Sequence, residues 1–292
     1  MANKKIGKIL SVIFTLIFFA GVLIMLYPIV SDWWNSRVQS QAVASYNEII
    51  EKVDTAALEA MLNEARDYNK KLARLEQPIF EYDQVPDYDR ILDISGTGII
   101  GCISIPVIDV EFPIYHGTSE EVLSIAAGHF QGTSFPVGGE TTHSVISAHR
   151  GLPTAKLFTD LDKVVVGDTF TITILNEIFT YEVEEILIVT PDKTEDLAIL
   201  PGKDYVTLMT CTPYGVNTHR LLLRSRRIET IYRSNAKVVS DAMQVDSMTV
   251  FPVVCIPLIM MLVMYWVLGG GKSKKTTISR MNYEMLFSKG GE

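Results

Sequence analysis

Two uncharged apolar runs near the ends of the chain constrain its organisation most strongly. Residues 9–30 contain no charged side chain over 22 positions, and residues 248–268 form a second uncharged run. A helix of about 20 apolar residues crosses the hydrocarbon core of a bilayer. Pro252 and Pro257 interrupt the second run, but neighbouring groups can satisfy the backbone bonds that such prolines free. The sequence therefore predicts two transmembrane helices with a domain between them.

The charges that flank these runs predict the orientation of the chain. Basic residues lie on the terminal side of each run: Lys4, Lys5, Lys8, Lys272, Lys274, Lys275 and Arg280. The positive-inside rule then places the tails 1–8 and 269–292 in the cytoplasm and the intervening domain outside the cell membrane, in a two-pass topology. Trp33 and Trp34 stand where an interfacial aromatic belt begins. A cleaved signal peptide ending near 42–44 is the rival interpretation, but its apolar region is usually about 7–15 residues, shorter than this run.

The domain between the tails is acidic. Residues 9–271 contain 18 basic and 32 acidic side chains, because 8 basic and 2 acidic residues lie in the tails. An acidic surface repels phosphate backbones, so we expect no nucleic-acid partner. The predicted two-pass topology makes membrane lipid, through the spans, and secreted proteins the expected partners.

Three segments of different character follow the first span. Residues 31–76 repeat apolar side chains at steps of three and four, which predicts helices, with Asp54 and Thr55 ending one and capping the next. Residues 77–98 carry two prolines, two glycines and several acidic residues, which is typical of a functional loop or lid. A linker at 231–247 precedes the second span.

Residues 99–230 show the pattern of an all-β domain. Seven short apolar or alternating runs are separated by turn residues, which predicts a sandwich or a barrel. Short helices fit at 119–127 and 154–161. No repeat and no metal-ligand spacing is present in the sequence.

Cys211 is the residue whose surroundings suggest chemistry. The alternation of the run TLMTC puts Thr207, Met209 and Cys211 on one strand face, and Pro213 ends that strand. A loop of roughly seven residues leads to the next strand, which is compatible with an antiparallel pair that brings Arg220 to the same end. A permanent cation lowers the pKa of a thiol and suits an oxyanion, but it cannot act as a base.

A base or acid must then come from elsewhere, and histidine is the favoured type, with five available at positions 116, 129, 143, 149 and 219. His149 ends a predicted strand just before Gly151, and His219 points away from Arg220 in a regular strand. The pattern favours His149 without excluding the others.

Several strings give the chain a specific resemblance. They are YHGT at 115–118, GHFQGTSFPVGG at 128–139, THSVISAHRGLPTAKLF at 142–158, LDKVVVGD at 161–168 and TLMTCTPYGVNTHRLLLRSRR at 207–227. Over about residues 65–230 the chain resembles the class C, pilin-polymerising sortases of Gram-positive bacteria. The resemblance implies an eight-stranded sortase β-barrel at 99–230, with short helices, preceded by N-terminal helices.

The resemblance also implies roles. Cys211 matches the family nucleophile, His149 the catalytic histidine and Arg220 the catalytic arginine. Such an enzyme cleaves an LPxTG-like sorting signal, keeps the acyl group as a thioester, and transfers it to a pilin lysine without a metal or nucleotide cofactor. Its partners are pilin or surface proteins that carry the signal.

The lid-like loop departs from the family pattern. Class C sortases place Asp-Pro-aromatic before the barrel, whereas this chain has Gln77-Pro78-Ile79 followed by Phe80. The aspartate is lost or replaced by Glu76 or Glu81. We therefore expect a looser or differently anchored lid that proteases cut near 77–90.

Alternative interpretations stay open at this point. A sortase that attaches surface proteins to peptidoglycan is the second candidate. A non-enzymatic, membrane-tethered binding domain with a Cys102–Cys211 disulfide is the third. Cys102 otherwise has the pattern of a small buried hydrophobe. The carboxylates at 81–93 match no calcium loop and predict a solvated acidic segment.

Overall fold

The computed structural model describes residues 2–230, 257, 259 and 260. The chain divides into two compact units, Met1–Leu26 with Lys237–Glu292 and Tyr27–Ala236. In the described part of the chain, one helix, Val12–Glu51, is long and apolar enough to span a membrane, as an N-terminal signal sequence also would be. The predicted second span, 248–268, and the linker 231–247 lie outside the described residues, apart from 257, 259 and 260.

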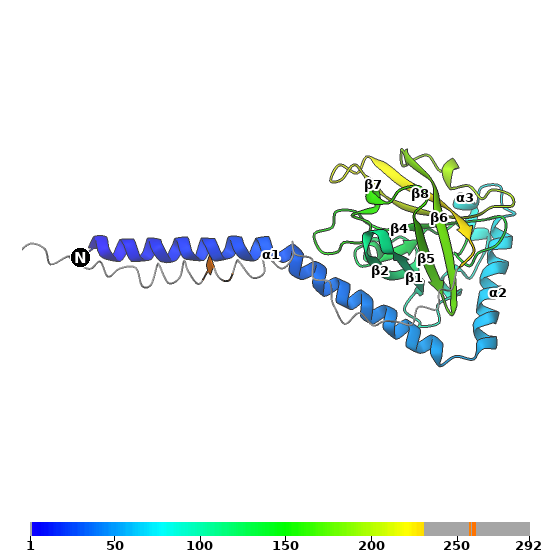
Figure 1. Ribbon diagram of the computed structural model, residues 1–292, viewed down its shortest axis with the longest axis horizontal. Helices are drawn as coiled ribbons and strands as arrows, with labels where there is room; N and C mark the ends of the chain where they lie inside the picture. Colours follow the sequence, from blue (N-terminus) through cyan, green and yellow to red (C-terminus); the bar gives the residue numbers. More distant parts are fainter. Residues whose placement is uncertain (1, 231–256, 258, 261–292) are drawn as a thin grey trace, which may run out of the picture. The chain divides into compact units, whose positions relative to one another are not determined.

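Two long helices precede the barrel, as the periodicity predicts. Helix α1 is Ala2–Glu51 and helix α2 is Thr55–Leu72. Asp54 is the N-cap residue of α2, but its side chain makes no capping bond, so the prediction holds for the helix boundary and not for the cap. The buried face of α2 consists of Leu58, Leu62, Ala65, Tyr68, Asn69 and Leu72. Asn69 is the polar member of this face, and its amide bonds both the amide nitrogen and the carbonyl of Phe135, at 2.7 and 2.9 Å. Figure 1 shows α2 alongside the barrel.

The predicted lid-like loop is more ordered than its composition indicates. It contains helix α3, Pro78–Glu81, and two 3-10 turns, Tyr82–Gln84 and Tyr88–Arg90. Tyr88 is buried, and its hydroxyl accepts from the amide of Gly117 and bonds His129 Nδ1, both at 2.9 Å. The second half of the loop is therefore fastened to the barrel.

Eight strands form a closed barrel in the order β1-β2-β3-β4-β7-β8-β6-β5. Their bounds are β1 Ile99–Ile105, β2 Val110–His116, β3 Ala127–His129, β4 Thr142–Ser147, β5 Thr169–Ile174, β6 Glu177–Val189, β7 Asp204–Thr212 and β8 His219–Ile228. Closure removes free strand edges. The all-β prediction is confirmed, and so is the eight-stranded barrel that the resemblance implied.

The differences from the sequence prediction lie in short elements. Strand β3 has three residues, too few for a visible alternation, and the pattern does not predict it. Helix α4 occupies only Glu120–Leu123 of the predicted 119–127. The helix predicted at 154–161 is wrong, because residues 154–156 belong to no helix and 157–160 form turns before a 3-10 turn at Leu161–Lys163. Two backbone groups of this segment bond side chains of α1: the Lys156 amide donates to Asp32, and the Thr154 carbonyl accepts from Asn35.

The barrel interior takes alternate residues of each strand. Val206, Leu208 and Thr210 of β7 are at most 1% exposed. Successive strand residues point to opposite faces, so Met209 and Cys211 lie on the outer face of the barrel. This register decides which side chains can meet at the site.

Candidate active site

The carboxyl end of β7 carries Cys211, directly opposite Arg220 at the start of β8. The antiparallel register pairs these two residues, and the preceding pair is Thr210 with Leu221. Both members of that preceding pair are buried toward the barrel interior. Directly opposed residues point to the same face with Cβ atoms about 4.5–5.5 Å apart. Cys211 and Arg220 therefore lie side by side on the outer face.

The parallel register of β4 and β7 brings His149 to the same end. Ser147 pairs with Met209, and the amide of Ala148 donates to the Met209 carbonyl at 3.2 Å. The next positions on the outer face, two residues further on, are His149 and Cys211. The structure thus gathers the three predicted catalytic residues at one end of three neighbouring strands.

The surroundings of His149 come from two segments outside the sheet. Its Nε2 lies 3.4 Å from Glu120 Oε2, with 27% of the histidine side chain exposed. Its carbonyl accepts from the amide of Phe158 at 3.2 Å. The next residue, Arg150, is nearly buried and its Nη1 lies 3.4 Å from Thr212 Oγ1. These contacts join the segment after His149 to the strand end after Cys211.

Arg220 bonds backbone rather than a carboxylate. Its Nη1 donates to the carbonyls of Asn217 and His219, at 3.3 and 3.2 Å. Among residues 2–230 no ion pair links Arg220 to an acidic side chain. Glu81, one of the two proposed replacements for the family aspartate, instead accepts from the amide of Gln77 at 3.0 Å. The guanidinium keeps donors that can meet an oxyanion.

Two other histidines are structural. His129 bonds Tyr88 and the carbonyl of Ser134, and burial lowers its pKa to about 3. His143 bonds Thr207 Oγ1 and a backbone carbonyl, and burial lowers its pKa to about 4. Both rings are neutral near pH 7 and buried, at 0% and 1% exposure.

The remaining two histidines lie elsewhere. His116 is partly buried, with Nε2 2.8 Å from the carbonyl of Ile91, and burial lowers its pKa. His219 precedes Arg220 on β8 and so points to the opposite side of the strand. Of the five histidines, His149 alone follows a strand on the outer face beside Cys211.

The two described cysteines do not form a disulfide. Both Cys102 and Cys211 are free thiols. Cys102 lies buried on β1 within the core, and burial raises its pKa to about 12. The disulfide on which the binding-domain interpretation relied is therefore absent from this structure, and Cys102 packs as a small hydrophobe.

An apolar cluster on the outer face continues from the Cys211 end, and Ile79 of helix α3 packs against it. This outer apolar cluster comprises Val145, Leu197 and Leu222 with the partly buried Ile79, Phe130, Leu187, Val189 and Met209. Val189 pairs with Arg220 across β6 and β8, so the cluster reaches the site. Ile79, from the lid-like loop, thus packs on the face that carries Cys211. A cavity of about 430 Å³ lies beside α3, lined in part by Gln77, Pro78, Ile79 and Leu197.

A glycine permits this position of α3. Gly132 has φ +90°, and a Cβ there would lie 2.8 Å from the Ile79 Cα. Real Cβ atoms do not approach backbone so closely, so a side chain at 132 would displace α3. Phe80, next to Ile79, is exposed.

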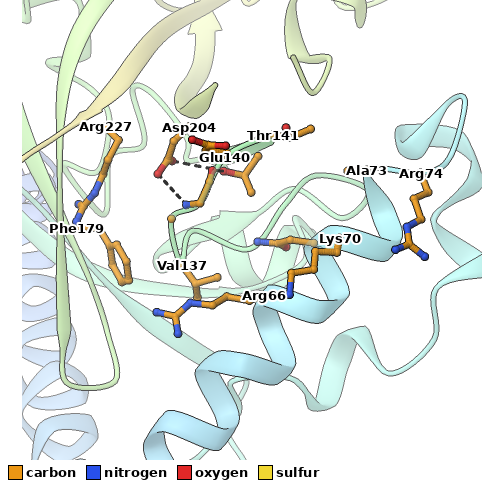
Figure 2. Close-up of a pocket in the computed structure, with 14 residues that line it drawn as sticks. Arg66, Lys70, Ala73, Arg74, Val137, Glu140, Thr141, Phe179, Asp204 and Arg227 are labelled. Atoms are coloured by element: carbon orange, nitrogen blue, oxygen red, sulfur yellow. Dashed lines mark hydrogen bonds between the residues drawn. The ribbon is translucent and has the colours of Figure 1, made fainter. Parts of the chain in front are cut away.

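A larger cavity of about 680 Å³ lies between α2 and the β3–β4 connection. Figure 2 shows Arg66 and Lys70 of α2, with Arg74 just beyond the end of the helix, on one side of this space and Asp204 and Arg227 on the other. Asp204 begins β7, at the opposite end of the strand from Cys211, and burial raises its pKa. The cavity contains none of the three predicted catalytic residues. Of the four cations that line it, Arg66 and Lys70 are paired with Glu177 and Asp67.

The acidic segment at 81–93 shows no calcium geometry. Within the described residues, no group of three or more His, Cys, Asp or Glu side chains could hold a metal ion. Arg90 from this segment pairs with Glu64, which joins the segment to α2.

Comparison with known proteins agrees with this geometry. A sortase domain family matches residues 103–228. Sortase A of Streptococcus agalactiae serotype III (strain NEM316) is 33% identical over 117 residues, which is 39% of this chain and 47% of that protein. The chain thus spans about half the length of this curated relative, and the match to sortase D of Bacillus subtilis (strain 168) spans 63% of that protein.

Solved structures match over more of their length. Sortase C1 from Streptococcus agalactiae is 46% identical with a TM-score of 0.60, covering 65% of this chain and 99% of that one. Sortase C of Streptococcus pneumoniae, described with pilin substrate specificity, is 43% identical with a TM-score of 0.60, covering 65% and 97%. The chain belongs to the sortase family, and its structural relatives place it with the class C sortases.

Proposed function

We propose that this protein is a cysteine transpeptidase in which Cys211 is the nucleophile, His149 the acid and base, and Arg220 the oxyanion donor. The convergence of these three residues on the outer face of β4, β7 and β8 is the observation that carries the proposal. A nucleophile, a proton carrier and a fixed cation at one strand end are the groups that acyl transfer needs.

The proposed reaction has two acyl-transfer steps. The Cys211 thiolate attacks the threonine carbonyl of an LPxTG-like sorting signal, and Arg220 stabilises the developing oxyanion. The peptide bond after threonine breaks, and His149 protonates the leaving amine. A lysine amine of a pilin subunit then attacks the thioester and gives a proton to His149. The carbon–sulfur bond breaks, an isopeptide bond remains, and the thiolate is regenerated. The thioester conserves the energy of the first bond, so the steps need no nucleotide or metal.

Pilin polymerisation is the specific function that we infer. Similarity to a sortase C with pilin substrate specificity supports it, as does the lid-like segment at Gln77, Pro78 and Ile79, which contacts the outer apolar cluster. We propose that this segment covers the binding path for the sorting signal and must move when substrate enters. Anchoring of surface proteins to peptidoglycan is the second candidate, and the family membership supports it equally.

The membrane arrangement is part of the proposal. Spans at 9–30 and 248–268 would hold residues 31–247 outside the cell, with a helical segment to 76, a lid-like loop at 77–98, a catalytic barrel at 99–230 and a linker at 231–247. The cytoplasmic tails would be 1–8 and 269–292. The apolar helix in Val12–Glu51 supports the first span.

The deciding experiment incubates the full chain, in detergent or membranes, with candidate pilins that carry sorting signals. SDS-resistant ladders that require Cys211 and disappear in Cys211→Ala are expected. If the sorting signal is only hydrolysed, the proposed transfer to a pilin lysine is contradicted. If the acyl group is transferred only to peptidoglycan-like amines, the second candidate, anchoring to peptidoglycan, is favoured. Thiol alkylation with mass spectrometry excludes the binding-domain interpretation if Cys102 and Cys211 are both recovered unbridged from active protein.

A further inference from the structure

A row of polar side chains lies on one face of α1, just after the apolar segment. Asp32, Asn35 and Gln39 are separated by steps of three and four, so they share a helix face. All three are partly buried, whereas most of the residues between them are exposed. The same face continues into the buried Val43 and Tyr46. This row is therefore the outer end of the stripe by which α1 packs against the domain.

Two members of the row hold the segment that follows His149. Asp32 Oδ1 accepts from the amide of Lys156 at 2.7 Å, and Asn35 Nδ2 donates to the carbonyl of Thr154 at 2.7 Å. Residues 154–156 belong to no helix or strand. Buried backbone groups need such partners, and α1 supplies them.

The held segment is bonded to His149 itself. The amide of Phe158 donates to the His149 carbonyl, and the amide of Gly151 donates to Thr159 Oγ1 at 3.1 Å. Arg150 Nε donates to the carbonyl of Thr159 at 3.2 Å. A shift of residues 154–159 would therefore move the backbone of His149.

Gln39, the third residue of the row, bonds the segment after α4, the helix that contacts the ring of His149. Gln39 Nε2 donates to the carbonyl of Ile125 at 2.6 Å, directly after α4. Helix α4 carries Glu120, whose carboxylate lies 3.4 Å from His149 Nε2. One face of α1 thus holds both the segment that carries the backbone of His149 and the segment that meets its ring.

We propose that Asp32, Asn35 and Gln39 form a brace that positions His149 against Cys211. They touch neither substrate nor reacting atoms, so they are positioning residues. The mechanistic meaning of the brace rests on the proposed function, in which His149 carries the proton. Helix α1 begins in the apolar N-terminal segment that is the predicted membrane anchor. Through the brace, the same helix therefore also helps to position the active site.

The test compares the full chain with the double variant Asn35→Ala/Gln39→Ala. Ser40→Ala is the matched control, because the Ser40 hydroxyl is exposed and bonds only the Ser36 carbonyl within α1. Amide hydrogen exchange of residues 119–126 and 150–160 is expected to rise about 2- to 12-fold for each lost bond, the range that one hydrogen bond implies. The control is expected to match the wild type.

A second readout follows His149 rather than the loops. The pH profile of Cys211 alkylation, read on the Cys211 peptide by mass spectrometry, is expected to shift in the double variant and to stay unchanged in the control. With an LPxTG-like peptide, kcat is expected to fall while KM changes less than about twofold, since the substrate face is intact. Asp32→Asn keeps an acceptor oxygen and is expected to behave as wild type.

The outcomes separate the two proposals. Unchanged exchange and an unchanged alkylation profile in the double variant would overturn the brace, as would equal changes in Ser40→Ala. Absence of peptide cleavage by the wild type would overturn the proposed function. The hydrogen-exchange and alkylation measurements would still show whether the brace positions His149. If the double variant does not fold, the single variant Gln39→Ala is measured at residues 119–126 by the same criteria.

Discussion

Gly132→Ala is expected to release helix α3 from the outer apolar cluster. The new Cβ would lie 2.8 Å from the Ile79 Cα and 3.1 Å from the Pro78 carbonyl oxygen. Because both are backbone atoms, no side-chain rotation relieves the overlap, and α3 itself must move. Ile79 then loses its packing on the face that carries Cys211.

Gly167→Ala is the matched control for this change. Gly132 has φ +90° and Gly167 has φ +93°, but a Cβ at Gly167 meets nothing within 4 Å. Both variants carry the left-handed backbone cost of about 1–2 kcal/mol. Only Gly132→Ala also displaces Ile79. Full burial of such a side chain contributes about 1.5–3 kcal/mol, so the half-buried Ile79 contributes about 1 kcal/mol. The open lid should then be populated about fivefold more than in the control.

Limited proteolysis and peptide kinetics measure this difference. Cleavage within residues 77–90 is expected to be faster in Gly132→Ala than in Gly167→Ala, and KM for an LPxTG-like peptide is expected to fall. Full protection of 77–90 in every form would contradict a loosely anchored lid. Equal cleavage and equal KM in the two variants would refute the reasoning that Ile79 restrains the lid.

Three further predictions concern single residues. Arg220→Lys keeps the charge but loses the planar fork of donors, so we expect kcat for an LPxTG-like peptide to fall at least about tenfold, with little change in the thermal midpoint. Asn69→Ala removes both bonds to Phe135 and leaves its buried backbone groups unpaired. Urea unfolding should therefore show a free energy of unfolding lower by about 2–4 kcal/mol. At the exposed Asn63, the same change to alanine should lower it by under about 0.5 kcal/mol. His143 has a folded pKa of about 4, below its unfolded value near 6.5, so the unfolded state binds the extra proton and stability falls as pH drops from about 6.5 to 4. His143→Gln should remove part of that pH dependence, up to about 3 kcal/mol, and an unchanged slope would contradict it.

Much of the fold follows from local patterns. The runs that form β1, β2 and β4–β8 extend over six or more residues, and α2 shows its buried face at helical spacing. Strand β3 has no such signal, because three residues carry no period. The prediction of a helix at 154–161 is wrong because the backbone partners of this segment are Asp32 and Asn35, more than 100 residues away in the chain. Local propensity contains no information on such partners.

The active-site residues likewise fall into those that local sequence patterns predict and those that only the tertiary structure reveals. The alternation in TLMTC and the short loop after it are local features, and they suffice to predict that Cys211 and Arg220 lie at one sheet end. The choice among five histidines needs the parallel pairing of β4 with β7, which joins segments about 60 residues apart. Gly132, Asn69 and the brace on α1 have no local signal, since each matters only through what lies against it.

By itself the sequence determined the apolar N-terminal helix, the strand-rich domain and the cysteine–arginine pair, because each depends on residues close together in the chain. Tertiary structure decided the rest. It placed His149 on the outer face of the barrel and buried His129 and His143, which keeps both rings neutral near pH 7. It also packed Ile79 against the outer apolar cluster. The physical reason is that strand register and burial arise from contacts between distant segments, and a one-residue change of register would turn the side chains of a strand to the other face.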